Sequence, residues 1–444
     1  MQFKMQSREI PLQAGWDIIV VGGGVAGTGA AIAAAREGSK VLLLEAMGCL
    51  GGLGSAGMVP GWCGPHDGVR FINHSLFETV RKRMAGMLGY DNADSIDCPR
   101  FQNPEYLKII LDDMAEEAGV ETWFFTKMAA VEMADERSVD ALIVTRKEGL
   151  LALRAPVYID ATGDGELAAW AGAEVMKGDE NGRMQPVTLC AAFGGVDRAN
   201  IWKNDPKDWK QNIENDPELP LLQGGFINPG QALGNWTALT NAGHLYNIDG
   251  TSTADLTTGM IEGRRLAMEM LKGFKKHLPD GYRDAELVTT ASLLGVRETR
   301  RIVGDYILKA EDHTARRSFD DEIARNHFFL DVHHSKEELE QIRSGKLDWQ
   351  KVKKSGSLDP GESHGIPYRC LTPKDLDNVL VAGRNVSADR LAHGAIRVMP
   401  PCMSMGEAAG IAAHLAAGSE NADTHSVDVD IVRKRIREEG GYLP

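Results

Sequence analysis

The residues with the clearest chemical meaning form a short glycine-rich segment near the start of the chain. The segment Gly22-Gly23-Gly24-Val25-Ala26-Gly27 fits G-x-G-x-x-G and stands between a β-branched run at 18–21 and an alanine-rich stretch at 26–36. In such a turn the first glycine permits the sharp bend, the second lets the backbone approach a pyrophosphate, and the third lets helix and strand pack closely. The N-terminus of the following helix attracts the anion. The segment therefore predicts a dinucleotide-binding turn.

An acidic residue follows where a bound dinucleotide would place its ribose. Glu45 stands 23 positions after Gly22 (45 − 22), at the end of a second apolar run at 41–44. A carboxylate there can accept hydrogen bonds from a ribose diol, whereas an arginine would indicate a 2′-phosphate. The glycines alone are a weak signal, but the glycines, the strand–helix–strand context and the terminal acid together are specific. This unit does not by itself distinguish a nicotinamide from a flavin dinucleotide.

The elements that position this turn belong to an ordinary globular chain. Its 444 residues are 43% hydrophobic, 25% charged and 6% aromatic, which argues against disorder, collagen-like repeats and coiled coil. The net charge of −14 works against binding to nucleic acid or to an anionic membrane. Glycine is over-represented, with 49 residues, and many of these cluster where the backbone would approach a ligand. We therefore expect a small-molecule partner, with no nucleic acid and no membrane.

The cysteines indicate neither a metal centre nor a secreted protein. No two of them have the Cys-x-x-Cys spacing, so we expect no metal site and no redox dithiol. The first sixteen residues hold no apolar run long enough for a signal peptide, and the stretch 18–35 suits a buried strand and helix better than a membrane span. A cytoplasmic location is therefore expected. The six cysteines are Cys49, Cys63, Cys98, Cys190, Cys370 and Cys402.

Apolar periodicity predicts further elements on both sides of a change in composition near residue 190. Before it, the predicted elements are a helix at 105–118, a strand at 120–125, an antiparallel hairpin at 129–133 and 141–145, and a strand at 157–161. After it, the elements are loops or a cap at 200–220, a helix at 254–274, a surface excursion at 335–362, a strand at 378–383 and a helix at 404–417.

Three further segments carry a family resemblance. Residues 48–57 directly after Glu45, Ala161-Thr162-Gly163-Asp164, and Leu380-Val381-Ala382-Gly383-Arg384 resemble the FAD-dependent oxidoreductases of the glutathione-reductase structural superfamily. Within that group, the stretches 295–302, 365–369 and 396–400 are similar to the bacterial FAD-dependent oxidoreductase family, and the similarity extends from about residue 16 to 415. The resemblance implies one FAD bound along the first domain.

The resemblance also implies the fold and the cofactor contacts. The expected fold is α/β, with a Rossmann-type three-layer FAD-binding domain at 1–190 and 366–444 and an inserted α+β substrate (cap) domain at 191–365. An alternative assignment returns the stretch 286–330 to the FAD-binding domain. A helix starting near Ser404 could direct its positive end at the flavin, or could only pack on the sheet. The residues assigned to FAD are Gly22, Gly24, Val25, Ala26 and Gly27 at the pyrophosphate, Glu45 at the adenosine ribose, Gly51 and Gly52 near the ribityl chain and ring, Met128 at the adenine, Gly163, Asp164, Gly383 and Arg384 around the phosphate and ribityl portion, and Ala46, Ser55 and Ala161 as cofactor-binding residues without a specified part of FAD.

Residues 163–168 approximate a second dinucleotide fingerprint. The preceding strand follows a hairpin and does not open a βαβ unit, and no strand-terminal acid stands about 20 residues later. Without a second nucleotide domain or a dithiol, a disulfide reductase fed by NADPH is not expected. Electrons would then pass through a single flavin, from a donor to an acceptor that the sequence does not identify.

The prediction of the substrate-binding residues rests on another resemblance. His393-Gly394-Ala395-Ile396-Arg397 is similar to the segment of fumarate reductase and succinate dehydrogenase flavoproteins in which this histidine and arginine hold a substrate carboxylate. The residues at 398–402 depart from that pattern, so a dicarboxylate substrate does not follow. Arg397 offers a planar clamp for a carboxylate or a vicinal diol, while a purely structural role for both residues stays open.

Other cationic and imidazole groups are weaker candidates. Arg297 belongs to a run with Arg300 and Arg301 that could equally be a salt-bridged face. His364 and His244 are further acid/base candidates, although an isolated histidine is more often structural.

The predicted function is hydride transfer between flavin N5 and a small polar, hydroxyl- or carboxylate-bearing substrate. His393 or His364 would handle the coupled proton, and Arg397 with Arg297 would orient the substrate. The alternatives are an ene-reductase resembling fumarate reductase and an accessory electron-transfer flavoprotein subunit. A homo-oligomer is compatible with the sequence.

Overall fold

The computed structural model describes residues 9–73, 75–203, 207–223, 226–234, 236–346, 348–349 and 356–444. Its centre is a parallel five-stranded sheet with the order β17-β8-β2-β3-β4. Four of these strands are buried along their whole length, as expected for apolar strands covered on both faces. The strands are β2 (Ile18–Val21), β3 (Val41–Leu44), β4 (Glu121–Trp123), β8 (Val157–Asp160) and β17 (Val379–Val381).

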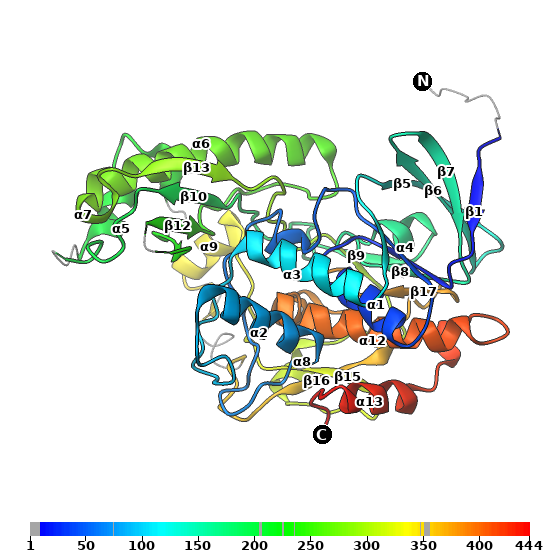
Figure 1. The fold of residues 1–444 in the computed structure, drawn as a ribbon. Coiled ribbons are helices and arrows are strands. Elements are labelled where there is room, and N and C mark those ends of the chain that lie inside the picture. Colours follow the sequence, from blue (N-terminus) through cyan, green and yellow to red (C-terminus); the bar gives the residue numbers. More distant parts are fainter. Residues whose placement is uncertain are drawn as a thin grey trace.

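Helices cover one face of this sheet. Side chains that alternate along its strands, such as Ile18 and Val20, point into the core that these helices share. Helices α1 (Val25–Arg36) and α12 (Met399–Ala417) lie side by side at the centre of the molecule (Figure 1). A Cβ atom on Gly406 would overlap the carbonyl oxygen of Ala26, so this glycine lets the two backbones touch. The layer also contains α2 (Leu76–Leu88), α3 (Pro104–Glu117) and α13 (Val429–Glu438).

A four-stranded sheet with the order β1-β7-β6-β5 covers the other face. The antiparallel pairing of β5 and β6 confirms the predicted hairpin, and the three layers confirm the predicted Rossmann-type FAD-binding architecture. The strands are β1 (Leu12–Ala14), β5 (Lys127–Met133), β6 (Val139–Arg146) and β7 (Gly149–Arg154).

The cap is a second body with its own sheet and core (Figure 1). Its sheet has the order β11-β12-β10-β13, and the long helix predicted at 254–274 packs on it as α6. Rings of Phe193, Phe274 and Tyr282 meet in its core. The cap elements are β10 (Ala191–Gly194), β11 (Gln231–Ala232), β12 (Thr237–Thr240), β13 (Glu286–Thr290), α5 (Trp209–Glu214), α6 (Thr253–His277) and α7 (Pro279–Tyr282).

The chain returns to the first domain soon after β13. The core of the cap ends at Val296, and Leu308, Ile323 and Leu330 lie in the core of the first domain. The stretch 286–330 is thus divided, and the cap is shorter than the predicted 191–365. The returning elements pair as β14 (Arg300–Ile302) with β9 (Val175–Lys177) and β15 (Glu322–Asn326) with β16 (His364–Pro367).

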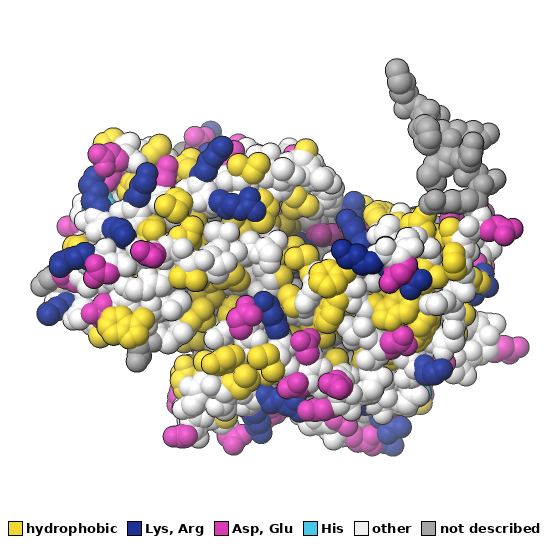
Figure 2. Space-filling model, turned by 45° about the horizontal axis from the view of Figure 1, so that its top comes forward, with side chains coloured by type: hydrophobic (Ala, Val, Ile, Leu, Met, Phe, Trp, Pro, Cys, Tyr) yellow, Lys and Arg dark blue, Asp and Glu magenta, His cyan; other side chains and the backbone are white. Residues whose placement is uncertain are grey.

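Short helices complete the fold: α4 (Glu166–Trp170), α8 (Ala310–Thr314), α9 (Lys336–Arg343) and α11 (Arg390–Ile396). The predicted surface excursion at 335–362 contains α9, and residues 347 and 350–355 of it lie outside the described part of the chain, as do residues 204–206 of the predicted loop region. Figure 2 shows charged side chains of both signs interspersed over one face of the molecule. No helix within the described ranges is long and apolar enough to cross a membrane.

Candidate functional site

A large cavity begins at the carboxyl ends of β2, β3 and β8 and continues to the base of the cap. Its empty volume is about 1850 Å³, including the open solvent at its mouth. Ligands of open α/β sheets bind in this position, outside the carboxyl ends of the strands. The wall includes Gly22 and Glu45 at one end, and Arg297 and Arg397 at the other. The cavity therefore links the predicted dinucleotide turn to the predicted substrate arginines.

The glycines of the fingerprint differ in what a side chain would meet. Gly22 has φ +100°, and a Cβ there would lie 2.5 Å from the carbonyl oxygen of Ala161. A Cβ on Gly24 would meet nothing within 4 Å, because this glycine borders the cavity. Gly27 does not line the cavity, and a Cβ there would overlap the carbonyl oxygen of Gly22. Gly22 thus permits the turn, Gly24 leaves room for a ligand, and Gly27 allows the helix to touch the strand.

The start of α1 is an uncapped helix end at the cavity wall. Its N-cap is Gly24, no side chain caps it, and no acidic residue stands in its first turn. Val25 and Ala26 of this turn line the cavity. Free backbone N–H groups and the positive end of the helix dipole suit a phosphate group.

Glu45 directly follows β3 and is held by the backbone around it. Its Oε2 accepts a hydrogen bond from Gly23 N–H at 2.7 Å, and its Oε1 accepts one from Met47 N–H at 2.6 Å. Burial raises the pKa of the Glu45 carboxyl, while these hydrogen bonds oppose the shift. Each carboxylate oxygen has a second acceptor site, so a ribose diol can still donate to this side chain.

Arg384 supplies a cation at the cavity wall. Its Nη2 lies 2.9 Å from Asp164 Oδ1, which also accepts a hydrogen bond from Thr299. Its Nη1 is buried and has no hydrogen-bond partner among the described residues. Gly163 and Gly383, at φ +75° and +97°, leave no room for side chains beside Arg384 and Ala26. A buried donor with no partner and this tight glycine wall fit a phosphate-containing cofactor.

Most of the other predicted cofactor residues also line the cavity. They are Ala46, Gly51, Gly52, Met128 and Ala161. Ser55 is an exception, because its hydroxyl donates to the carbonyl oxygen of Leu50 and packs under Gly51. Ser55 thus supports the loop that faces the ligand. Sequence reasoning missed Thr126 and Lys127, which stand directly before Met128 and line the same wall.

The helix predicted to start near Ser404 begins five residues earlier. Its first residue is Met399, and Val398, Met399 and Cys402 line the cavity. The side chain of Ser404 bonds to Asn73 and to the backbone of Pro400. Two consecutive prolines, Pro400 and Pro401, suggest a helix break in the sequence, but proline is tolerated in the first turn of a helix.

The two histidines predicted as acid/base groups do not border the cavity. His393 is fully buried, and its Nε2 lies 2.7 Å from the carbonyl oxygen of Arg384. His364 is fully buried on β16, where its Nε2 lies 3.1 Å from the amide nitrogen of Asn326 and its ring meets that of His313. Burial holds the pKa of both imidazoles well below the usual value. We therefore correct the prediction: His393 fixes the backbone of Arg384, and His364 joins two strands.

The two predicted substrate arginines do line the cavity. Arg297 Nη1 donates to the carbonyl oxygen of Pro186 at 2.7 Å and to Thr188 Oγ1 at 2.9 Å. Arg397 Nη2 donates to the carbonyl oxygen of Asp331 at 3.0 Å and lies 3.4 Å from its Oδ2. Burial, together with the charge of Arg397, lowers the pKa of Arg297 to about 10. The guanidinium group of Arg297 therefore stays charged at neutral pH.

The three arginines of the run, Arg297, Arg300 and Arg301, make different contacts. Arg300 donates to the carbonyl oxygen of Asp164 and so braces the cofactor wall. Arg301 donates to the carbonyl oxygens of Ala388 and Gly178 and pairs with Glu298. Arg297 alone in this run reaches the cavity.

An imidazole pair lies behind the arginines. His333 Nδ1 and His244 Nε2 are 3.0 Å apart, and His333 Nε2 is 3.6 Å from Asp331 Oδ1. Burial and the charge of Arg297 lower the pKa of His333 to about 4 and that of His244 to about 2. Burial opposes ionisation of Asp331, but His333 and Arg397 hold its pKa at about 2. Sequence reasoning named His244 and missed its two partners, which lie in a segment without periodicity.

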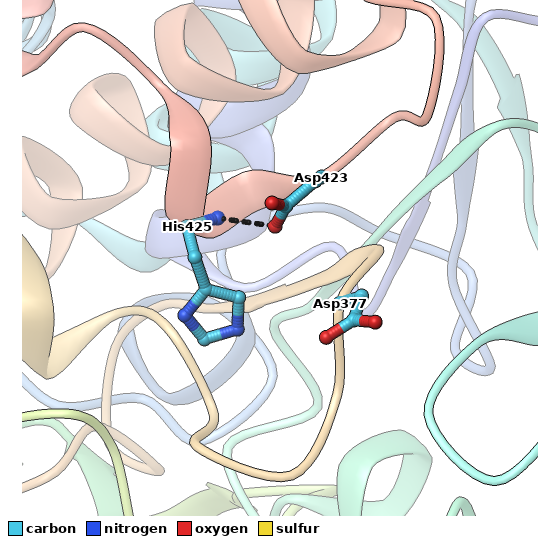
Figure 3. A group of neighbouring side chains, drawn as sticks. All are labelled: Asp377, Asp423 and His425. Atoms are coloured by element: carbon cyan, nitrogen blue, oxygen red, sulfur yellow. Dashed lines mark hydrogen bonds between the residues drawn. The ribbon is translucent and has the colours of Figure 1, made fainter.

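A second cluster of ionisable groups consists of Asp377, Asp423 and His425, whose side chains lie close together (Figure 3). None of these three residues lines the cavity. Arg137 Nε donates to Asp377 at 2.6 Å, and the two ring nitrogens of His425 lie 2.7 Å from Asp305 Oδ2 and 2.9 Å from the carbonyl oxygen of Leu376. These two hydrogen bonds raise the pKa of His425 against the effect of burial. Because both ring nitrogens are engaged, the cluster is an ion-pair network.

The layered sheet, the fingerprint turn and the cavity beside it define a Rossmann-type dinucleotide-binding protein. The chain belongs to the FAD dependent oxidoreductase family, whose family model matches residues 17–436. FAD is accordingly its cofactor. The close glycine packing, the uncapped start of α1 and the unpartnered Nη1 of Arg384 fit the phosphates of such a group.

The comparison with solved structures found similar proteins at low sequence identity. A flavin-dependent brominase is 13% identical over 97% of this chain and 84% of its own, with a TM-score of 0.46. A geranylgeranyl bacteriochlorophyll reductase-like protein from Thermoplasma acidophilum is 13% identical over 96% of this chain and 84% of its own, with a TM-score of 0.43. No curated protein matches the sequence significantly.

Proposed function

We propose that this protein is an FAD-dependent oxidoreductase that transfers a hydride between flavin N5 and a C–H bond of a small polar substrate. The observation that carries the proposal is the single cavity that connects the pyrophosphate turn at Gly24 with Arg297 and Arg397. Bound FAD supplies the redox chemistry, and the protein supplies binding, orientation and electrostatics.

The residues of the chain divide this work between the two ends of the cavity. When FAD is bound, the start of α1 and Arg384 would hold its pyrophosphate, and Glu45 would hold its ribose. Arg297 and Arg397 orient the polar substrate, because a guanidinium group offers several donors in one plane. Because both side chains are held in place, they would keep the reacting C–H bond in one orientation, which lowers the barrier to the reaction.

The proton that accompanies hydride transfer needs a group that reaches the cavity. His393 and His364 do not reach it, so neither has a place in the proposed mechanism. Cys63 lines the substrate end, where it is exposed to solvent. Desolvation by the surrounding protein atoms and the charge of Asp331 raise the pKa of its thiol to about 11. This thiol is protonated at neutral pH and can donate a hydrogen bond to a substrate oxygen.

An anaerobic screen tests the proposal. The oxidised holoenzyme is mixed with polar alcohols, sugars and hydroxy acids, and the photoreduced holoenzyme with unsaturated acids. The proposal expects one class of compound to change the flavin absorbance in a saturable way. Bleaching by an alcohol supports a dehydrogenase, whereas reoxidation by an unsaturated acid supports the ene-reductase alternative. A flavin that exchanges electrons only with a protein partner would contradict the proposal and support an accessory subunit.

A further inference from the structure

The substrate end of the cavity holds two guanidinium groups, those of Arg297 and Arg397, and among the described residues one carboxylate, that of Asp331, acts on both of them. Asp331 pairs with Arg397, and Asp164 pairs with Arg384. Within the described ranges, no carboxylate lies within ion-pairing distance of Arg297, whose recorded hydrogen-bond acceptors are the uncharged Pro186 carbonyl and Thr188 hydroxyl.

Asp331 also attracts Arg297, but from beyond ion-pairing distance and while it is paired with Arg397. Four further groups near Arg297 do not supply a second negative charge. The imidazoles of His244 and His333 are neutral at pH 7. The thiol of Cys190 is protonated, because burial raises its pKa to about 12. Glu298, next in the chain, directs its carboxylate to Gln185, Arg301 and Arg390.

Leaving such a charge buried is costly for a protein. Arg297 is 8% exposed, and an unpaired ion in this environment destabilises the fold unless a ligand of opposite charge neutralises it. Arg297 Nε and Nη2 donate to no described residue, and Arg397 Nε is buried without a partner. These donors belong to two side chains of the cavity wall.

The rest of this end of the cavity is uncharged. Leu293, Val296, Val398 and Met399 present apolar surface, and Asn241 presents an amide. A ligand that matches this wall has one anionic head group and an uncharged body.

We propose that the substrate of this protein is a monocarboxylate whose carboxylate group binds to Arg297, with Arg397 as the second cation. This inference rests on the proposed function and deepens it, because it names the substrate class of the same site. A planar, bidentate pairing of guanidinium and carboxylate is the geometry that arginine provides. The neutral carboxamide of the same shape would leave the charge of Arg297 unpaired.

The test uses the full-length holoenzyme with propanoate and benzoate, each compared with its own carboxamide at constant ionic strength. Binding is measured by equilibrium dialysis and by the change in flavin absorbance. At least one carboxylate should bind at least about tenfold more tightly than its amide, a ratio equivalent to about 1.4 kcal/mol. Arg297→Gln should abolish this preference, and Arg297→Lys should retain part of it. Arg154→Gln, an exposed partner of Asp140, is the matched control and should change nothing.

Three results would overturn the inference. The first is that neither carboxylate is preferred to its amide by the wild-type holoenzyme, a result that does not depend on any variant. The second is that Arg297→Gln keeps the preference. The third is that Arg297→Gln changes the flavin spectrum but not the binding of the carboxylates. That result would show that the positive charge of Arg297 acts on FAD and not on the substrate. A wild-type protein whose flavin exchanges electrons with no small molecule would contradict the proposed function, and is a separate outcome.

Discussion

Replacing Gly24 by alanine should weaken FAD binding without destabilising the fold, so the variant tests the two effects separately. Gly24 has φ −63° and ψ 177°, values that alanine adopts without strain, and the added methyl group would meet no protein atom within 4 Å. The variant should therefore fold, with the FAD-free protein unchanged or more stable by about 0.4–1 kcal/mol. The methyl group would instead occupy the space through which a pyrophosphate approaches the start of α1.

The loss of affinity follows from the hydrogen bonds that the methyl group would block. A hydrogen bond to a charged group contributes about 1.5–3 kcal/mol, so losing one weakens FAD binding by roughly 10- to 150-fold. The dissociation constant is measured by quenching of FAD fluorescence, and the stability of the FAD-free protein by urea unfolding.

Two other glycines provide controls for this experiment. Gly86 lies in α2, where an added Cβ also meets nothing within 4 Å, so Gly86→Ala should stabilise the fold and leave FAD affinity unchanged. Gly27→Ala should destabilise the fold, because the methyl group would overlap the carbonyl oxygen of Gly22. A Gly24→Ala protein that binds FAD as tightly as the wild type would refute the placement of the pyrophosphate.

Three more substitutions test other parts of the structure. Arg384→Gln should weaken FAD binding by about tenfold or more in the fluorescence titration, since it removes a buried cation from the phosphate wall; unchanged affinity would place the phosphates elsewhere. Gly406→Ala should lower the free energy of unfolding by about 1–3 kcal/mol, because its methyl group would force α12 away from α1; an unchanged urea midpoint would contradict that close packing. Burial raises the pKa of Glu407 from 4.5 to about 7, so between these pH values the folded state binds a proton that the unfolded state has lost. The contribution of Glu407 to the free energy of unfolding should therefore fall as the pH rises from 4.5 to 7. Glu407→Gln should remove up to about 3 kcal/mol of this fall, measured as the difference between the two proteins in urea unfolding at pH 5 and pH 8; identical pH dependence would show that Glu407 does not titrate in this way.

The cofactor end of the site was predictable because its residues are close together in the sequence. The run from Gly22 to Gly27 combines turn, helix start and ligand contact in six residues, and the buried strands around it are continuous apolar runs. Local spacing therefore carries most of the geometry there. The spacing did not show that Ser55 supports the loop from beneath, because that depends on how the loop folds over it.

The substrate end was less predictable, since it depends on which way side chains point. His393 and Arg397 lie one turn apart on α11 and its C-cap, yet the arginine lines the cavity and the histidine turns to the backbone of Arg384. Asp331 and His333 stand in a loop without a motif and meet His244 only in the folded chain. The division of 286–330 between two domains likewise depends on long-range packing.

The most direct test of the central claim is a titration of the FAD-free protein with FAD. Our account predicts saturation at one FAD per chain, with the yellow spectrum of a bound flavin, and no comparable binding of a nicotinamide dinucleotide. A folded protein that takes up no FAD, or that prefers a nicotinamide dinucleotide at the same cavity, would contradict it.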